Sequence, residues 1–187
     1  MDIPTLSTER LCLRPWQQGD LQAFAALNAD PAVMRHFPAC MSRDDSDALA
    51  ARIHAHFAEH GFGPWIVERR SDGAFLGVLG MQQVGFEAAF TPAVEIAWRL
   101  NQAFWRQGYA LEAARAVLEY AFAHLCLTEL VAFTVPANLP SQGLMRRLGM
   151  CHDAAAGFEH PHLPEGHPLR PHLLFRIRRE QWLEARA

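Results

Sequence analysis

The residues of this sequence that could do chemistry gather in the segment EIAWRLNQAFWRQGYALEAA, which runs from Glu95 to Ala114. A predicted strand, 94–100, leads into a loop that contains Gly108, and the loop opens the strongest predicted helix of the chain. The N-terminus of a helix presents free backbone N–H groups and the positive end of the helix dipole, which together bind anions. The segment therefore predicts an anion site of moderate specificity, because a plain strand-to-helix turn has the same pattern.

A second group of polar residues follows thirty residues after Gly108. Asn138 and Ser141 lie in the segment PANLPS, and a predicted helix, 140–148, ends before Gly149. These two segments resemble the motifs of the GNAT superfamily of N-acetyltransferases. WRQGYALEAARAVLEYAF is similar to its acyl-CoA-binding motif, and PANLPSQGLMRRLGM is similar to the strand–helix motif that follows it. Each motif alone is moderately specific, whereas their order and spacing together are far more so.

Three further segments extend the resemblance to roughly residues 5–180. LSTERLCLRPW and PAVEIAWRL resemble the RimJ/RimL-type branch, whose best-known members acetylate N-terminal amines of ribosomal proteins. The tail FEHPHLPEGHPLRPHLLFRI is similar to the ending of one bacterial subgroup of this branch, which includes members that acetylate small molecules and peptides with free amines.

The resemblance implies acetyl-CoA as the co-substrate, and it assigns three groups of residues to the cofactor. The phosphate cradle would consist of Arg106, Gln107, Gly108, Tyr109 and Ala110. The pantetheine arm would pair with the backbone of Ile96, Ala97 and Trp98. The end of the arm near the sulfur would be approached by Asn138 and Ser141. Trp105 replaces the superfamily's usual glutamine or arginine, but we expect phosphate binding to persist because backbone donors make most of that contact.

The acceptor amine must be neutral when it attacks the thioester carbonyl. Deprotonating a lysine-like amine at pH 7 costs about 4–5 kcal/mol, whereas an α-amine costs only about 1 kcal/mol. Glu95 is the candidate base, acting directly or through water, because it lies on the strand that would hold the cofactor arm. A structural role, or a role in orienting the substrate ammonium, is equally compatible with the sequence.

The departing thiolate of coenzyme A needs a proton or a hydrogen bond. Many members of the superfamily use a tyrosine seven residues after the asparagine, and this chain has Met145 there. Ser141 is the remaining hydroxyl in this segment, so we assign it the donor role. A role as the N-cap of the helix that follows is the structural alternative.

The acceptor site is the least determined part of the sequence. His160, in the tail motif, and two of the aromatic residues that flank the predicted strands, Phe37 and Phe86, are candidates to contact the acceptor. Core packing is the usual role of such aromatic residues, and a structural hydrogen bond is as plausible for His160. The histidines of the tail lack the spacing of a zinc site, so we expect no metal.

Composition excludes several other classes of protein. The net charge is −3 and all 17 basic residues are arginines, without the basic excess of a nucleic-acid binder. Neither a signal peptide nor an apolar run of membrane-spanning length is present, which predicts a cytoplasmic protein that does not bind membranes. The 4 cysteines are widely spaced, which favours free thiols over disulfides or zinc.

The predicted elements alternate between strands and helices over a single domain, 1–187. Strands are predicted at 10–14, 65–68, 75–81, 94–100, 130–135 and 172–178, with a hairpin signal at Ser71-Asp72-Gly73. Helices are predicted at 20–28, 42–60, 110–125 and 140–148; the first is followed by a break at Asp30-Pro31, and the second opens with the Ser-x-x-Asp pattern of a helix start at Ser42. This order predicts an α+β protein with a mixed, mostly antiparallel central sheet and helices on both faces, the fold of GNAT acyl-CoA N-acyltransferases.

We therefore expect an acyl-CoA-dependent N-acetyltransferase that acts on a primary amine, either a small molecule or the N-terminus of a peptide or protein. A non-catalytic acyl-CoA-binding sensor of the same fold is the alternative, and Met145 is the residue that supports it. The acceptor's identity and dimerisation stay open.

Overall fold

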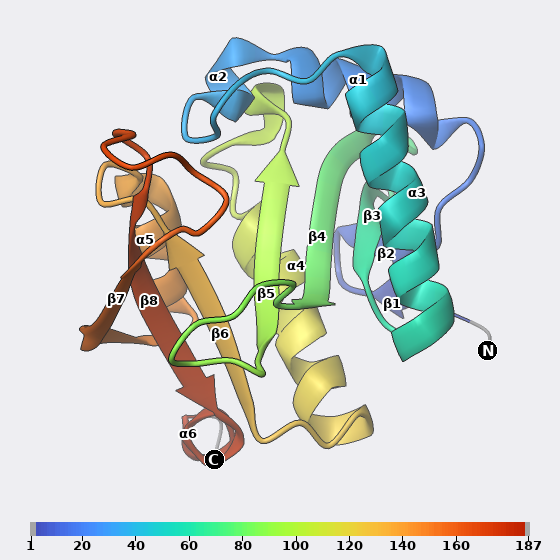
Figure 1. Cartoon of the computed structure of the whole chain (residues 1–187). Helices are drawn as coiled ribbons and strands as arrows, with labels where there is room; N and C mark the ends of the chain where they lie inside the picture. The colour runs from blue at the N-terminus through green and yellow to red at the C-terminus, as the bar shows by residue number, and fades with distance from the viewer. Residues whose placement is uncertain (1–2, 186–187) are drawn as a thin grey trace. The chain divides into compact units, whose positions relative to one another are not determined.

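The computed structural model describes residues 3–185 and divides them into two compact units (Figure 1). The first unit comprises the chain up to Gln82 together with Ala97–Val117, and the second comprises Gln83–Ile96 and the chain from Leu118 onward. Strand β5 (Val94–Leu100) and helix α4 (Tyr109–Glu119) contribute residues to both units. The single domain expected from the sequence stays a prediction.

The strands of the first unit form an antiparallel ladder in chain order. These strands are β1 (Leu6–Ser7), β2 (Leu11–Arg14), β3 (Pro64–Arg69) and β4 (Phe75–Gln83). The predicted hairpin between β3 and β4 is confirmed: Gly73 has a φ of 70° in the turn, and Arg69 donates two hydrogen bonds to Asp72. A left-handed residue at this position is most easily glycine.

The helices of the first unit follow their sequence signals. Helix α3 (Arg43–His60) starts at a capping box in which Ser42 Oγ accepts from Asp45 N at 3.1 Å, as the Ser-x-x-Asp pattern predicts. Helix α1 (Asp20–Ala29) packs on α3 (Figure 1). The break predicted at Asp30-Pro31 is confirmed, because α1 ends at Ala29 and Asp30 is extended; Asp30 then caps a short helix, α2 (Pro31–Met34).

The segment after β5 contains a 3-10 turn, η1 (Gln102–Phe104), and then α4. The predicted helix 110–125 is confirmed in position, but its last turn widens into a π-helix, η2 (Tyr120–His124). The apolar face of this helix is buried, as its three-and-four spacing predicts; the fully buried members include Ala113, Ala114, Val117, Leu118, Ala121 and Phe122.

The second unit contains a parallel ladder, in which Glu95 of β5 pairs with Val131 of β6 (Glu129–Thr134). β6 pairs antiparallel with β8 (Pro171–Arg178), and β8 pairs with β7 (Cys151–Glu159). Helix α5 (Leu139–Arg147) contacts β6, and α6 (Arg179–Glu184) contacts β8. The mixed, mostly antiparallel α+β architecture predicted from the sequence is confirmed.

Strand β7 was not predicted from the sequence. Its residues, CHDAAAGFE, include no β-branched side chain, and most of them are exposed. Pairing with β8 on one side is what makes this segment a strand. Strand β1, only two residues long, was missed for the same lack of a local signal.

Candidate functional site

The predicted phosphate loop has the backbone of an anion-binding turn. Arg106 and Gly108 both have positive φ angles, of 58° and 85°, and α4 begins at Tyr109 immediately after them. A left-handed conformation is unusual for arginine, and such turns direct neighbouring N–H groups into one concave site. The first N–H groups of α4 add donors that have no acceptor within the helix. Arg106 and Gln107 are exposed, so the loop is open to a ligand.

Arg10 and Glu112 hold this loop in place from a segment that is distant in sequence. Arg10 Nε donates to Glu112 Oε2 at 2.7 Å, and Arg10 Nη1 donates to the carbonyl oxygen of Gln107 at 3.0 Å. The Arg10 guanidinium lies 4.5 Å from the centroid of the Tyr109 ring. Each contact falls on the loop or on the first turn of α4, so Arg10 fixes both with one planar group.

The Glu112 carboxylate is saturated with donors from the same segment. Thr8 Oγ1 donates to Glu112 Oε1 at 2.6 Å, and Arg10 N donates to the same oxygen at 2.8 Å. Burial acts to raise the pKa of Glu112, but the hydrogen bonds from Thr8 and Arg10 hold that pKa below its ordinary value. The carboxylate is therefore ionised at neutral pH and completes the support of the loop.

Trp105, the departure from the superfamily pattern, supports the loop from its other side. Its Nε1 donates to the carbonyl oxygen of Leu100 at 2.8 Å, across the 3-10 turn. Gln107 Nε2 donates to the carbonyl oxygen of Ala103 at 2.9 Å, which ties the loop to the same turn. The side chain at position 105 thus shapes the backbone rather than presenting a polar group to phosphate.

In the second unit, Glu95 and the start of α5 carry the predicted reaction residues. Glu95 is buried, with 8% of its surface exposed, and it forms the parallel bridge with Val131. Asn138 Nδ2 donates to Thr134 Oγ1 at 2.9 Å, beyond the bridge toward the end of β6. Asn138 Oδ1 accepts from Ser141 N at 3.3 Å. Asn138 is therefore the N-cap of α5, and the alternative reading of Ser141 as the N-cap is wrong.

The predicted cofactor strand runs through both units. Ile96 is buried in the second unit, whereas Ala97 and Trp98 belong to the first and are partly buried. Met145, at the position where many family members have tyrosine, is 2% exposed and is a core residue of the second unit. It supplies no hydroxyl to the reaction.

Two of the three predicted acceptor residues contact each other. The ring centroids of Phe86 and His160 are 4.9 Å apart. They belong to a cluster of aromatic and imidazole rings in the second unit, made of Phe86, Phe90, Phe133, Phe158, His160, His162 and His172. Phe37 lies in the first unit instead, with its ring centroid 4.2 Å from the Arg99 guanidinium.

Two imidazoles of this cluster, His160 and His172, favour their neutral form. Burial lowers the pKa of His160, and the neighbouring His172 and His162 lower it further. Burial also lowers the pKa of His172. His160 Nδ1 accepts from His162 N at 3.3 Å, a bond that a protonated Nδ1 cannot accept. His160 and His172 are therefore neutral at pH 7.

Comparison with known proteins agrees with this geometry. The family model described as "Acetyltransferase (GNAT) domain" matches residues 10–151. The chain belongs to the GNAT acetyltransferase family. It is an acyl-CoA-dependent N-acetyltransferase, as the resemblance of its motifs implies.

Individual GNAT relatives cover nearly the whole chain. The chain is 28% identical over 178 residues to the uncharacterized N-acetyltransferase YnaD of Bacillus subtilis, covering 95% of this chain and 98% of that protein. It is 29% identical to the FsC-acetyl coenzyme A-N(2)-transacetylase of Aspergillus fumigatus, covering 96% and 78%. A solved acetyltransferase from Agrobacterium tumefaciens is 28% identical, covers 95% of both chains and superposes with a TM-score of 0.77.

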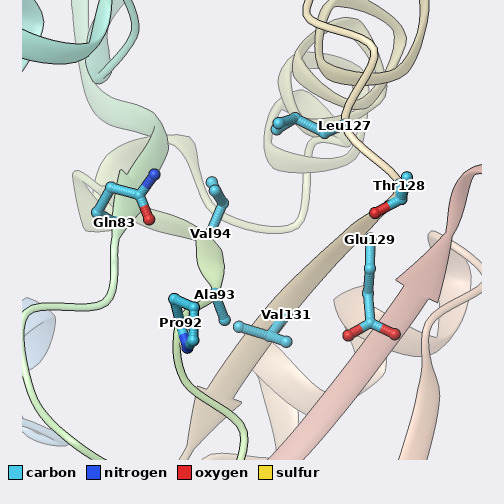
Figure 2. A pocket seen from close by; sticks show the side chains of 8 residues that line it. All are labelled: Gln83, Pro92, Ala93, Val94, Leu127, Thr128, Glu129 and Val131. Atoms are coloured by element: carbon cyan, nitrogen blue, oxygen red, sulfur yellow. The ribbon is translucent and has the colours of Figure 1, made fainter.

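One cavity of the second unit lies beside Glu95, because it is lined by Val94, the residue before Glu95, and by Val131, its bridge partner. It has a volume of about 340 Å³ and is lined by Gln83, Pro92, Ala93, Val94, Leu127, Thr128, Glu129 and Val131 (Figure 2). Val94 and Glu129 are the first residues of β5 and β6, whereas Asn138 follows the last residue of β6. The Glu129 carboxylate at its rim accepts from Arg176 at 2.7 Å, so its charge is already paired.

Two further predictions from the sequence concern metal binding and membrane spans. No group of histidine, cysteine and acidic residues within residues 3–185 has the geometry of a metal site. No helix in the same range is long and apolar enough to cross a membrane.

Sequence reasoning missed the residues that support the phosphate loop. Thr8, Arg10 and Glu112 are not assigned any role by the motif itself, although LSTER and ALEA both lie in segments that resemble the family. Their pairing spans more than 100 residues, which no local pattern predicts.

Proposed function

We propose that this GNAT enzyme transfers an acetyl group from acetyl-CoA to a primary amine by direct attack in a ternary complex. The observation that carries the proposal is the phosphate loop, in which two left-handed residues precede the N-terminus of α4 and Arg10 and Glu112 fix the turn. The diphosphate of coenzyme A would bind the N–H groups of Arg106–Ala110. The Aspergillus relative, whose name includes acetyl coenzyme A, supports acetyl as the group transferred.

We assign the rest of the cofactor to two further groups of residues. The backbone of Ile96, Ala97 and Trp98 pairs with the pantetheine arm as a partial extra strand. Asn138, with its side chain fixed between Thr134 and Ser141, contacts the end of the arm near the sulfur.

Glu95 and Ser141 are the proposed reaction residues. Glu95 accepts a proton from the acceptor ammonium, directly or through water, or else orients that ammonium; its burial on β5 suits both roles. Ser141 donates a hydrogen bond to the departing thiolate. Asn138, rather than Ser141, is the N-cap of α5.

The acceptor is an amine of a small molecule or of a peptide or protein N-terminus. Phe86 and His160 form part of its binding site in this proposal, because their cluster offers aromatic faces without a positive charge that would repel an ammonium group. We place the enzyme in the cytoplasm, a reducing compartment that suits its four free cysteines.

The proposal is tested by titrating the purified protein with coenzyme A in a calorimeter and then measuring release of free coenzyme A from acetyl-CoA with a panel of amines. Binding followed by amine-dependent release supports it, and a folded protein with no affinity for coenzyme A refutes it. The buried Met145 supports a second candidate function, a sensor that binds acyl-CoA without catalysing acetyl transfer. Tight binding without release from any amine would favour the sensor.

A further inference from the structure

Four phenylalanine side chains of the second unit form an aromatic patch that the described chain covers only in part. Two of them, Phe86 and Phe90, lie in the connection between β4 and β5; the others are Phe133 on β6 and Phe158 on β7. The ring centroid of Phe86 is 5.8 Å from those of Phe133 and Phe158, and the centroids of Phe90 and Phe158 are 5.0 Å apart. Each of the four keeps partial exposure, whereas Phe175 on β8 is fully buried. A continuous apolar surface that stays in reach of solvent is a feature of binding sites.

This aromatic patch lies on the face of the sheet to which Glu95 belongs. Glu95 of β5 is in register with Val131 of β6, and residues in register on neighbouring strands direct their side chains to the same face. Phe133, two residues after Val131, shares that face about 7 Å further along β6. The next residue, Thr134, accepts a hydrogen bond from Asn138, which we assign to the sulfur end of the cofactor arm. The patch therefore borders the place where the acceptor amine would meet the thioester.

The cavity beside Glu95 adjoins the aromatic patch along two segments of the chain. The β4–β5 connection runs from Phe90 in the patch to Pro92 in the cavity wall, and β6 runs from Val131 in the wall to Phe133 in the patch (Figure 2). The cavity volume of about 340 Å³ lies at the lower end of the range for small-molecule sites, about 300–1,000 Å³. Its wall mixes polar and apolar side chains, so it suits an amine and its water, while the patch suits the body of the molecule.

The chemistry of the aromatic patch limits what that body can be. Phenylalanine rings have no hydrogen-bonding group, so they recognise a ligand through apolar contact and ring packing. Two carboxylates of this unit that could pair with further ammonium groups of a polyamine are already engaged. Glu159 lies 3.3 Å from Arg170, and Glu129 accepts from Arg176 at 2.7 Å. The surroundings therefore favour a single amino group on an apolar body.

We propose that the aromatic patch binds an aromatic ring of the acceptor, so that the substrate is a primary amine that carries an aromatic side group. Phe86 is the central residue of this site, because its ring contacts those of the other three phenylalanines. Rings that pack edge to face or offset are stabilised beyond the area that they bury, which favours an aromatic over an aliphatic group. The inference rests on the proposed acetyltransferase function and names the substrate class of that site.

The test compares phenylalaninamide with alaninamide, which carry the same α-amine and differ only by the phenyl ring. For the unaltered enzyme we expect kcat/KM to favour phenylalaninamide by about tenfold to hundredfold, the usual effect of burying such a group. Phe86→Ala should bring the two values to within about threefold of each other, and Phe86→Leu, which keeps apolar bulk, should retain part of the preference. Leu183→Ala is the control and should leave the preference intact, because Leu183 is an exposed apolar residue of α6 in the same unit.

An unaltered enzyme without this preference overturns the proposal, as does a higher kcat/KM for spermidine, which has no aromatic ring, than for phenylalaninamide. A preference that survives in Phe86→Ala, with equal losses for both amides, would show that Phe86 only supports the fold and would also overturn it. Calorimetry with the two amides in the presence of coenzyme A gives a second reading that needs no turnover. If coenzyme A is never released, the acetyltransferase proposal fails by itself. Tighter binding of phenylalaninamide, lost in Phe86→Ala, would still support the aromatic site, and equal binding of the two amides would refute it.

Discussion

Arg10 Nε and Glu112 Oε2 lie 2.7 Å apart, joining the turn between β1 and β2 to the first turn of α4, 102 residues later in the chain. The two residues need not touch a ligand to matter, because Arg10 also holds the carbonyl oxygen of Gln107. The ion pair is partly exposed, so its direct contribution to folding stability is small. Its main consequence is the fixed geometry of the phosphate loop.

Replacing Glu112, the acidic residue of this ion pair, should weaken the binding of coenzyme A. In Glu112→Gln the loop loses the anchor of Arg10, and we expect the Kd for coenzyme A to rise by roughly three- to tenfold while the protein still folds. Calorimetry measures the change. Asp47→Asn, which breaks the exposed Arg43–Asp47 pair on α3, is the control. Equal Kd values for Glu112→Gln and the unaltered enzyme would show that the pair does not shape the site.

Gly108→Ala should lower the affinity for coenzyme A more than it lowers the folding stability. A Cβ at Gly108 would sit at a φ of 85° and 3.2 Å from Arg10 Nη2, within the loop that we propose binds the diphosphate. Gly73→Ala is a matched control, because Gly73 has a φ of 70° in the β3–β4 turn and no atom within 4 Å of its added Cβ. Both changes should cost about 1 kcal/mol of unfolding free energy. Only Gly108→Ala should reduce affinity for coenzyme A, by about tenfold or more.

Thermal unfolding of the two glycine variants measures the change in folding stability, and calorimetry measures the change in affinity for coenzyme A. A similar loss of coenzyme A affinity in Gly73→Ala would mean that backbone strain acts on the whole unit. The result would contradict a specific role of the Gly108 loop in binding coenzyme A.

The sequence predicts the helices and strands of this fold well, but it does not predict the contacts between residues distant in sequence that hold them in place. The capping box at Ser42 and the hairpin at Gly73 are local signals, and the structure confirms both. The phosphate loop is predicted because its glycine and the helix after it are neighbours in sequence. The contact of Arg10 with Glu112 depends on the arrangement of the sheet, which no local pattern contains.

The difference between local sequence signals and long-range contacts also explains which of the predicted acceptor-binding residues lie together in the structure. Phe86 and His160 contact each other because the β4–β5 connection and the end of β7 meet in one unit. Phe37 was grouped with them on residue type alone, and it pairs with Arg99 instead.

Glu95→Gln separates base catalysis from positioning. If Glu95 takes the proton of the acceptor, the variant should lose about 10²–10⁴-fold in kcat and recover part of this loss as pH approaches the pKa of the amine. The recovery arises because more of the amine is then neutral without help. A pH–rate profile measured between pH 6 and 10 decides, and a loss that is constant over this range would assign Glu95 to positioning.

Ser141→Ala removes the proposed donor to the thiolate without removing the helix cap. Because Asn138 caps α5 by accepting the backbone N–H of Ser141, which the variant keeps, the variant should fold normally and bind coenzyme A with unchanged Kd. We expect kcat to fall by about tenfold to hundredfold, measured by coenzyme A release at saturating substrate. Unchanged kcat would remove Ser141 from the mechanism.

The His160 cluster should make stability depend on pH in a defined window. The pKa of His160 is lowered by burial and by His172 and His162, so the unfolded chain binds this proton more readily than the folded one. The stabilisation is fully present above the unfolded pKa of about 6.5 and is lost as pH falls below it toward the folded pKa. His160→Phe keeps an aromatic ring against Phe86 but cannot be protonated. Urea unfolding at pH 7.5 and pH 5 should therefore show a smaller loss of unfolding free energy for His160→Phe than for the unaltered enzyme; equal losses would mean that other groups control the acid sensitivity.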